Sequence, residues 1–189
     1  ANWKMNKGLT DGFKTANLIS KKINNFKNKK YVLLPSLQSI FYIKNKLSTK
    51  KIIFGSQDCS QFKEGAYTGD ISASMIKEIG CKYVLIGHSE RRENSKENNV
   101  LLLNKLERAS ENKLKIIFCV GESLSDYKNK KRKQKLKIQL TNIFSKKVNL
   151  DMLIIAYEPV WAIGKNITPN IDEIDEIHLF IKEFMKRKY

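Results

Sequence analysis

Three ionisable residues of different chemistry stand in or directly after three short apolar runs. Lys4 lies in the first run of the chain, His88 follows the run that ends at Gly87, and Glu158 follows the run that ends at Tyr157. An ammonium group, an imidazole and a carboxylate together suit proton transfer next to a carbonyl on an anionic substrate. We therefore take Glu158 as a candidate base, His88 as a candidate electrophile and Lys4 as a candidate cation.

Each of these residues also has a structural explanation that needs no chemistry. His88 could be a histidine with satisfied hydrogen bonds, Lys4 is one of many lysines, and Glu90 could be a carboxylate that favours the first turn of a helix. Glu158 is the hardest to explain in this way, because a glutamate at the end of a buried strand is costly without a partner or a function. We interpret His178, in the middle of a predicted helix, as a surface or packing residue.

The elements that must position these residues alternate along the chain. Continuous apolar runs rich in β-branched and aromatic residues predict buried strands, the first of them weak, at residues 1–5, 31–35, 51–57, 82–87, 115–121 and 152–157. Apolar residues at helical spacing predict helices between them, with stripes from Phe13 to Phe26, Val100 to Leu106, Leu136 to Phe144 and Ile171 to Phe184. This alternation is typical of an α/β protein with a parallel sheet, either doubly wound or barrel-shaped. In both folds, chemistry gathers at the C-terminal ends of the strands.

The composition argues against two classes of protein. The net charge of +17 invites a nucleic-acid interpretation, and the densest basic run is KNKKRKQKLK at residues 128–137. Lysine is abundant along the whole chain, however, and this run lacks the interleaved aromatic residues that stack on bases. We interpret the run as a solvated helix face and expect no nucleic-acid partner. The apolar runs of about six residues are far shorter than the ~20 needed to cross a bilayer, so we expect no membrane partner.

Cysteine usage and the N-terminal residues bear on the cellular compartment. The three cysteines, Cys59, Cys81 and Cys119, are widely spaced, and each lies in or beside an apolar segment. They are typical of reduced core thiols and show neither a disulfide framework nor zinc-ligand spacing, so we expect no metal site. The first residues, ANWKMNKGLT, contain no apolar signal core, and we expect a cytoplasmic protein. No linker rich in proline, glycine or serine divides the chain, so we expect residues 1–189 to form a single domain.

Five motifs carry a resemblance to a known family. They are, in order, NWKMN (2–6), GAYTGDIS (65–72), VLIGHSERR (84–92), CVGE (119–122) and AYEPVWAIG (156–164). Together they resemble the motifs of the triosephosphate isomerase family over essentially the whole chain. The resemblance implies a TIM (β/α)8 barrel and an isomerase of glycolysis and gluconeogenesis. It also implies a triose phosphate as the small-molecule partner, dihydroxyacetone phosphate interconverting with D-glyceraldehyde 3-phosphate, and no cofactor.

The resemblance assigns the proton transfer to two residues. Glu158 would be the base that moves a proton between two carbons of the triose. His88 would be the neutral electrophile that hydrogen-bonds the carbonyl and the enediolate. The sequence supports this role physically, because a helix that begins at Ser89 would point its positive end at the imidazole and favour the neutral form.

Other matching residues would bind the phosphate and support the site. By resemblance, Lys4 would attract the phosphate and steady the developing charge, and Asn2 would line the same pocket. Gly164 would offer the phosphate an unhindered backbone N–H group. Glu90 and Cys119 would support these residues.

The segment after Glu158 resembles a lid that closes over the substrate. Closing would exclude water, which strengthens the base and protects the enediolate from losing its phosphate. After the segment WAIG (161–164) the family usually has Thr-Gly, whereas this chain has Lys165 and Asn166. We predict a left-handed conformation for Asn166, since asparagine tolerates positive φ. The lid residues would be Pro159, Val160, Trp161, Ala162, Ile163, Gly164, Lys165 and Asn166.

The loop at residues 56–70 is long for a connection between a strand and a helix. In the family, the matching loop reaches into a neighbouring subunit. The resemblance therefore implies a homodimer for the full-length protein, with Gln57 and Thr68 at the interface. The alternative is an ordinary surface loop.

The sequence departs from the family in its length. A full barrel has eight βα units and ~250 residues, whereas we count about six units and find no glycine after Gly164. We therefore expect a partial chain that lacks the start of the first strand and everything after the sixth helix, and that cannot close a barrel. An inactive fragment or a shortened barrel protein without isomerase activity remains the alternative. A Schiff-base aldolase is disfavoured, because the sixth predicted strand ends at Glu158 and not at a lysine.

Overall fold

A computed structural model of the chain describes residues 1–23, 29–49, 51–141, 143–165 and 167–188. Within these residues, one parallel sheet contains the strands β1 (Tyr31–Leu33), β2 (Ile52–Ser56), β3 (Tyr83–Ile86), β4 (Lys115–Val120) and β5 (Leu153–Tyr157). The strands are neighbours in their sequence order, from β1 to β5. A doubly wound sheet would reverse its order at a switch point, whereas the strands of a barrel follow one another. The sheet therefore has barrel topology, as the resemblance predicts.

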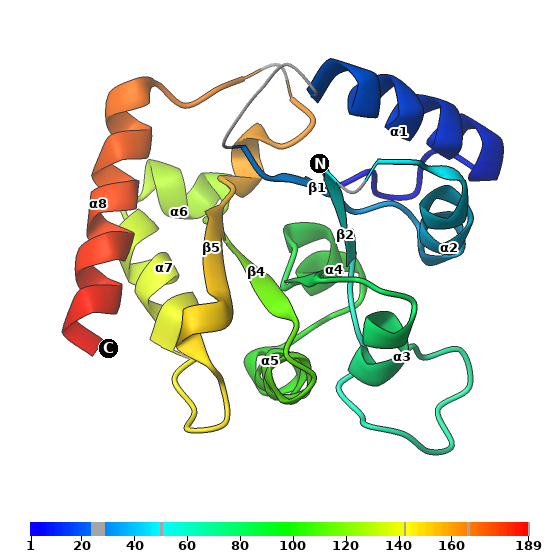
Figure 1. The fold of residues 1–189 in the computed structure, drawn as a ribbon. Coiled ribbons are helices and arrows are strands. Elements are labelled where there is room, and N and C mark those ends of the chain that lie inside the picture. Colours follow the sequence, from blue (N-terminus) through cyan, green and yellow to red (C-terminus); the bar gives the residue numbers. More distant parts are fainter. Residues whose placement is uncertain (24–28, 50, 142, 166, 189) are drawn as a thin grey trace.

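Helices lie around the outside of the curved sheet (Figure 1). Helix α5 packs on β3 and β4, and α7 packs on β4 and on α8. Two short 3₁₀ turns precede and follow β5, at Leu150–Met152 and Val160–Ala162. The helices are α1 (Leu9–Ile23), α2 (Leu37–Lys46), α3 (Ala73–Glu78), α4 (Ser89–Asn94), α5 (Asn99–Glu111), α6 (Leu124–Lys128), α7 (Arg132–Thr141) and α8 (Ile171–Lys188).

The first of the six predicted strands is reduced to a single bridge, between Asn2 and Leu34. The Trp3 N–H group donates to the Leu34 carbonyl at 3.0 Å, and the Leu34 N–H group donates to the Ala1 carbonyl at 2.9 Å. Beyond Trp3 the backbone turns, because Lys4 has a left-handed φ of 52°. The prediction of six strands is therefore replaced by five strands and one bridge within the described residues.

Strand β5 is less buried than its apolar sequence predicts. Its residues are half-buried, and Ile154 is 46% exposed. In the described part of the chain, β5 pairs only with β4. One edge of the strand therefore has no neighbour, and the sheet is open on that side.

In two helices, α5 and α7, not all residues of the predicted apolar stripe face the core. In α5 the side chains of Leu102 and Leu106 fill the core, whereas Val100 is 70% exposed. In α7 the prediction holds for Leu136, but Ile138 lies on the outer surface. The period of each helix is as predicted, but the sheet beneath it decides which side is buried.

Most of the remaining core agrees with the sequence, although Ile171, the first predicted stripe position of α8, is 76% exposed. Residues at the predicted stripe positions of α1 and α8, such as Ala16, Ile23, Ile177 and Ile181, are buried, and Phe26 lies outside the described residues. All three cysteines are free and buried, as the sequence predicts. No helix within the described ranges is long and apolar enough to cross a membrane.

Candidate active site

Lys4 is fixed by hydrogen bonds to its backbone and to its side chain. The Lys4 N–H group donates to Asn2 Oδ1 at 2.9 Å, and the Lys4 carbonyl accepts from Gln57 Nε2 at 2.9 Å. These bonds hold the left-handed backbone of Lys4 in place. The ammonium group then reaches Glu90 Oε1 at 2.6 Å. Gln57 thus has a role within the chain, holding the candidate cation, that the sequence did not reveal.

His88 is the N-cap of α4, which begins at Ser89 as predicted. Its Nδ1 accepts the backbone N–H group of Glu90 at 3.2 Å. An accepting Nδ1 carries no proton, so the ring is neutral and its proton is on Nε2. Nε2 lies 3.4 Å from Glu158 Oε2, and the imidazole itself is buried. The helix start therefore orients a neutral imidazole with its N–H group next to the candidate base.

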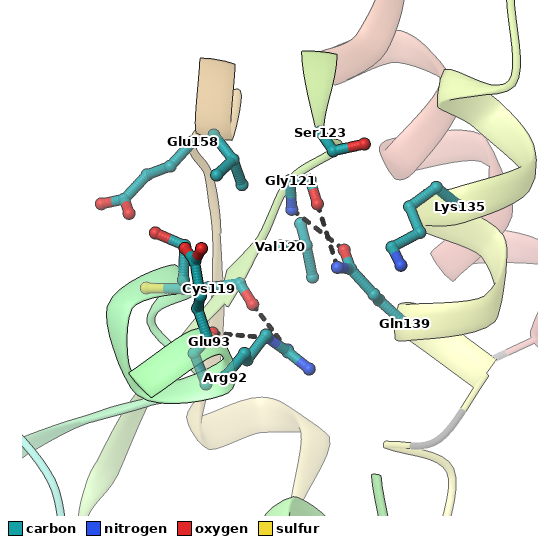
Figure 2. A pocket seen from close by; sticks show the side chains of 12 residues that line it. Arg92, Glu93, Cys119, Val120, Gly121, Ser123, Lys135, Gln139 and Glu158 are labelled. Carbon is teal, nitrogen blue, oxygen red and sulfur yellow. Dashed lines mark hydrogen bonds between the residues drawn. The ribbon is translucent and has the colours of Figure 1, made fainter. Parts of the chain in front are cut away.

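Glu158 follows β5 and is held by the end of β4. Its N–H group donates to the Val120 carbonyl at 2.8 Å, and its own carbonyl lies against Gly121. A Cβ atom at Gly121 would lie 2.8 Å from the Glu158 carbonyl carbon and closer still to its oxygen, so this approach requires glycine. The Gln139 amide accepts the Gly121 N–H group at 2.9 Å and donates to the Gly121 carbonyl at 3.0 Å (Figure 2).

Gln139 is a residue that sequence reasoning missed. It lies just after the lysine-rich run at residues 128–137, where nothing in the local sequence distinguishes it from a solvated helix residue. In the structure it is buried and hydrogen-bonds both the backbone N–H group and the backbone carbonyl of Gly121. It thereby fixes Gly121, and through Gly121 the backbone of Glu158.

Glu158 lies between two cavities. The larger, of about 570 Å³, is also lined by Asn2, Lys4 and His88. The smaller, of about 230 Å³, is lined by Arg92 and residues of β4 and α7 (Figure 2). In Figure 2 the Glu158 carboxylate extends away from the Gln139 side. The larger cavity gathers all three candidate groups, and its volume suits a small ligand.

The carboxylate of Glu158 is available for chemistry. Its Oε2 atom is buried, and within the described residues it accepts no hydrogen bond, although His88 Nε2 is near. Asn2 and Lys4 line the same cavity from the other side of the open sheet. The candidate base, the candidate electrophile and the candidate cation therefore line one cavity.

Arg92 and Cys119 support the strand ends beneath the site. The Arg92 guanidinium donates to the carbonyls of Gly87 at 2.7 Å and Cys119 at 2.9 Å, which ties the end of β3 to β4 (Figure 2). Burial lowers the pKa of Arg92. Burial, together with the nearby charge of Glu158, raises the pKa of the Cys119 thiol. Cys119 therefore remains a neutral packing residue.

The predicted lid begins in a short turn and ends in an exposed tip. Val160–Ala162 forms the 3₁₀ turn, and the Val160 N–H group donates to the Glu122 carbonyl at 3.0 Å. Trp161 is buried, and its Nε1 donates to Glu122 Oε1 at 2.9 Å. Gly164 is exposed with φ of 68°, and no atom comes within 4 Å of a Cβ built there. Asn166 lies outside the described residues, so its predicted left-handed conformation stays a prediction.

The predicted interface residue Thr68 is exposed on the long loop between β2 and α3. In this loop Phe62 and Tyr67 stack at a centroid distance of 3.7 Å. Across the described ranges, no three His, Cys, Asp or Glu side chains gather in a group that could hold a metal ion.

A parallel sheet in sequential order, with its polar residues gathered at the strand ends, defines an enzyme of the TIM-barrel class. A family model described as Triosephosphate isomerase matches residues 1–189. The chain belongs to the triosephosphate isomerase family. This result confirms the family, the fold and the isomerase class that the motifs predict.

Individual relatives agree with the family match. Triosephosphate isomerase of Bacteroides fragilis is 35% identical over 190 residues, an alignment that covers 100% of this chain and 76% of that protein. The enzyme of Mesomycoplasma hyorhinis is 38% identical over 188 residues, covering 96% and 76% respectively. The crystal structure of triosephosphate isomerase from Bartonella henselae has a TM-score of 0.88 at 32% identity, covering 100% of this chain and 75% of that chain.

Proposed function

We propose that this chain interconverts dihydroxyacetone phosphate and D-glyceraldehyde 3-phosphate in its larger cavity. The observation that carries the proposal is the meeting of Glu158, His88 and Lys4 in that cavity, with His88 Nε2 3.4 Å from Glu158 Oε2. Glu158 is the base, His88 the electrophile and Lys4 the cation. Asn2 and Glu90 hold Lys4, the former through its backbone and the latter through its ammonium group.

The reaction moves one proton between neighbouring carbons. Glu158 removes a proton from the carbon next to the substrate carbonyl, and the electron pair forms an enediolate. The Nε2–H group of His88 donates a hydrogen bond to the oxygen that gains charge, which lowers the barrier. Glu158 then returns the proton to the former carbonyl carbon, while the hydroxyl proton of the neighbouring carbon passes to the former carbonyl oxygen, so the carbonyl has moved by one carbon. Strand β5 and Gly121 hold the base in place, so little orientational freedom is lost on the way to the transition state.

The lid completes the proposed site. Ala162 and Ile163 line the larger cavity, so movement of the segment 159–166 changes its opening. Closing brings the Gly164 N–H group to the phosphate and removes water from the enediolate. Lys165 adds a positive charge beside that position.

The oligomeric state and compartment form a second part of the proposal. The exposed loop that carries Thr68 packs against a second copy of the chain, which makes the full-length protein a homodimer. Gln57 stands at the base of this loop and holds the Lys4 carbonyl, so packing of the loop would also steady Lys4. The reduced cysteines and the family's place in glycolysis support a cytoplasmic location.

The test is the isomerisation of dihydroxyacetone phosphate by the purified chain and its Glu158→Gln variant. The variant keeps the shape of the side chain and removes the base, so kcat should fall about 10²- to 10⁴-fold with little change in KM. Glu183→Gln, on the exposed side of α8, is the matched control and should not change kcat. A folded wild-type chain without activity would support the alternative of an inactive shortened barrel. Equal activity of the Glu158→Gln variant would remove Glu158 from the mechanism.

A further inference from the structure

Tyr127, on the one-turn helix α6, contacts the start of the lid and the first turn of α8, the helix that follows the lid. Its ring lies 4.6 Å, centroid to centroid, from the ring of Trp161 at the start of the lid. Its hydroxyl donates to Glu173 Oε1 at 2.7 Å, in the first turn of α8, which follows the lid. Trp161 and Glu173 are 34 and 46 residues away in sequence, so only the fold brings these groups to one side chain.

Each of the two contacts falls on a residue that is itself held. Trp161 donates to Glu122 Oε1 at 2.9 Å, and Glu122 follows Gly121 at the end of β4. Glu173 accepts the Asn170 N–H group at 3.1 Å, while its own N–H group donates to Asn170 Oδ1 at 2.8 Å. This reciprocal pair caps α8. The lid therefore runs between two fixed points, and Tyr127 joins them.

Arg132 places a positive charge beside the hydrogen bond between Tyr127 and Glu173. Its guanidinium contacts Glu173 Oε1 at 3.3 Å and Glu176 Oε2 at 2.7 Å, and it stands over the Tyr127 ring at 5.4 Å. Glu173 thus stays an anion that accepts strongly from the Tyr127 hydroxyl. Between the two anchors, Gly164 and Lys165 are exposed.

We propose that Tyr127 is a positioning residue that ties the start of the lid, and the first turn of the helix that follows the lid, to α6. With its ends fixed, the lid moves as a unit about them, and loss of either contact lets one end detach. The catalytic consequence rests on the proposed isomerase function. A loosened lid admits water and lets more of the enediolate lose its phosphate before the proton returns.

The first test is amide hydrogen exchange in the full chain, which does not depend on activity. Tyr127→Phe keeps the ring against Trp161 and removes the hydroxyl. Exchange in peptides that cover the lid and the first turn of α8 should become about fivefold faster, the effect expected for one net hydrogen bond. Tyr42→Phe, which removes a surface hydroxyl on α2, is the matched control and should leave these peptides unchanged. Unchanged exchange in Tyr127→Phe would overturn the proposal.

A double-mutant cycle with Glu173→Gln separates this contact from a general loss of stability. If the hydroxyl acts through Glu173, the two substitutions together should speed exchange no more than the larger single effect. Additive effects would show that Tyr127 does not act through Glu173 and would also overturn the proposal.

The second test measures the partition of the enediolate. Tyr127→Phe should raise the ratio of inorganic phosphate released to triose isomerised about threefold to tenfold, with little change in KM. A purely structural role would lower the melting temperature and leave this ratio unchanged, which would confine Tyr127 to stability. If the wild-type chain does not isomerise triose phosphate at all, the proposed function fails, while hydrogen exchange still decides the role of Tyr127.

Discussion

Substitution of Gly121 by alanine tests how the base is positioned. The new Cβ would stand 2.8 Å from the Glu158 carbonyl carbon and 3.5 Å from Val160 Cγ2. Carbon atoms in contact are normally about 3.5–4.0 Å apart, so the two backbones must separate by about 1 Å. Gln139 hydrogen-bonds both the N–H group and the carbonyl of Gly121, so Glu158 is the side that moves.

The expected cost follows from this displacement. A shift of about 1 Å in a catalytic group lowers the rate about 10²-fold, equivalent to about 2.7 kcal/mol in the activation free energy. The assay is kcat for isomerisation of dihydroxyacetone phosphate, measured beside the free energy of unfolding. Most of the loss should appear in kcat, because the substrate still meets Lys4 and His88.

Two other glycines provide controls for Gly121→Ala. Gly8→Ala meets no atom within 4 Å and should leave kcat and stability unchanged. Gly55→Ala would bring its Cβ to 2.6 Å from Leu34 Cδ2 and 2.8 Å from Tyr83 Cβ, away from Glu158, and should lower stability more than kcat per folded molecule. A Gly121→Ala variant with wild-type kcat would refute the argument that this glycine positions the base.

Three further predictions concern stability, thiol reactivity and pH. Lys113 has a left-handed φ of 54°, so Lys113→Gly should raise the free energy of unfolding by about 0.5–1 kcal/mol in urea titration, whereas Lys137→Gly inside α7 should lower it by about 1 kcal/mol. Burial raises the pKa of Cys59 to about 12 and of Cys81 to about 11, so neither thiol should react with a disulfide reagent at pH 8 until the chain unfolds; rapid reaction of the folded chain would contradict this. The hydrogen bond to the Glu173 carboxylate raises the pKa of Tyr127, so its contribution to stability is complete below about pH 10 and is lost as pH rises through the folded value. Between pH 9 and pH 11, the free energy of unfolding in urea should therefore fall more in the wild type than in Tyr127→Phe. Equal falls in the two proteins would contradict this pH dependence.

The sequence predicted much of the candidate site because the residues proposed to carry the chemistry lie within short motifs. Glu158 stands directly after β5 and His88 one residue beyond Gly87 at the end of β3, and parallel strands bring their C-terminal ends to one edge. The start of α4 at Ser89 and the acidic first turn of α8 could likewise be predicted from adjacent residues. Neighbours in the chain encode these features, since helix capping and strand propensity act over a few residues.

The supporting contacts could not be predicted in this way. Gln139 and Gly121 are 18 residues apart, and Gln57 meets the Lys4 carbonyl across 53 residues. The residues next to a glutamine on a lysine-rich helix do not indicate that its amide has a hydrogen-bond partner at the end of a distant strand. Which residue it meets depends on how α7 is rotated and placed against β4.

By itself, the sequence determined the kind of elements, their order, the family and the three groups proposed for proton transfer. Only the tertiary structure decided which face of α5 is buried, that β5 is an edge within the described residues, that Gly121 lies against the Glu158 carbonyl, and that Tyr127 hydrogen-bonds Glu173. The reason is physical: periodicity and capping depend on adjacent residues, whereas burial and cross-chain hydrogen bonds depend on the packing of whole elements against one another.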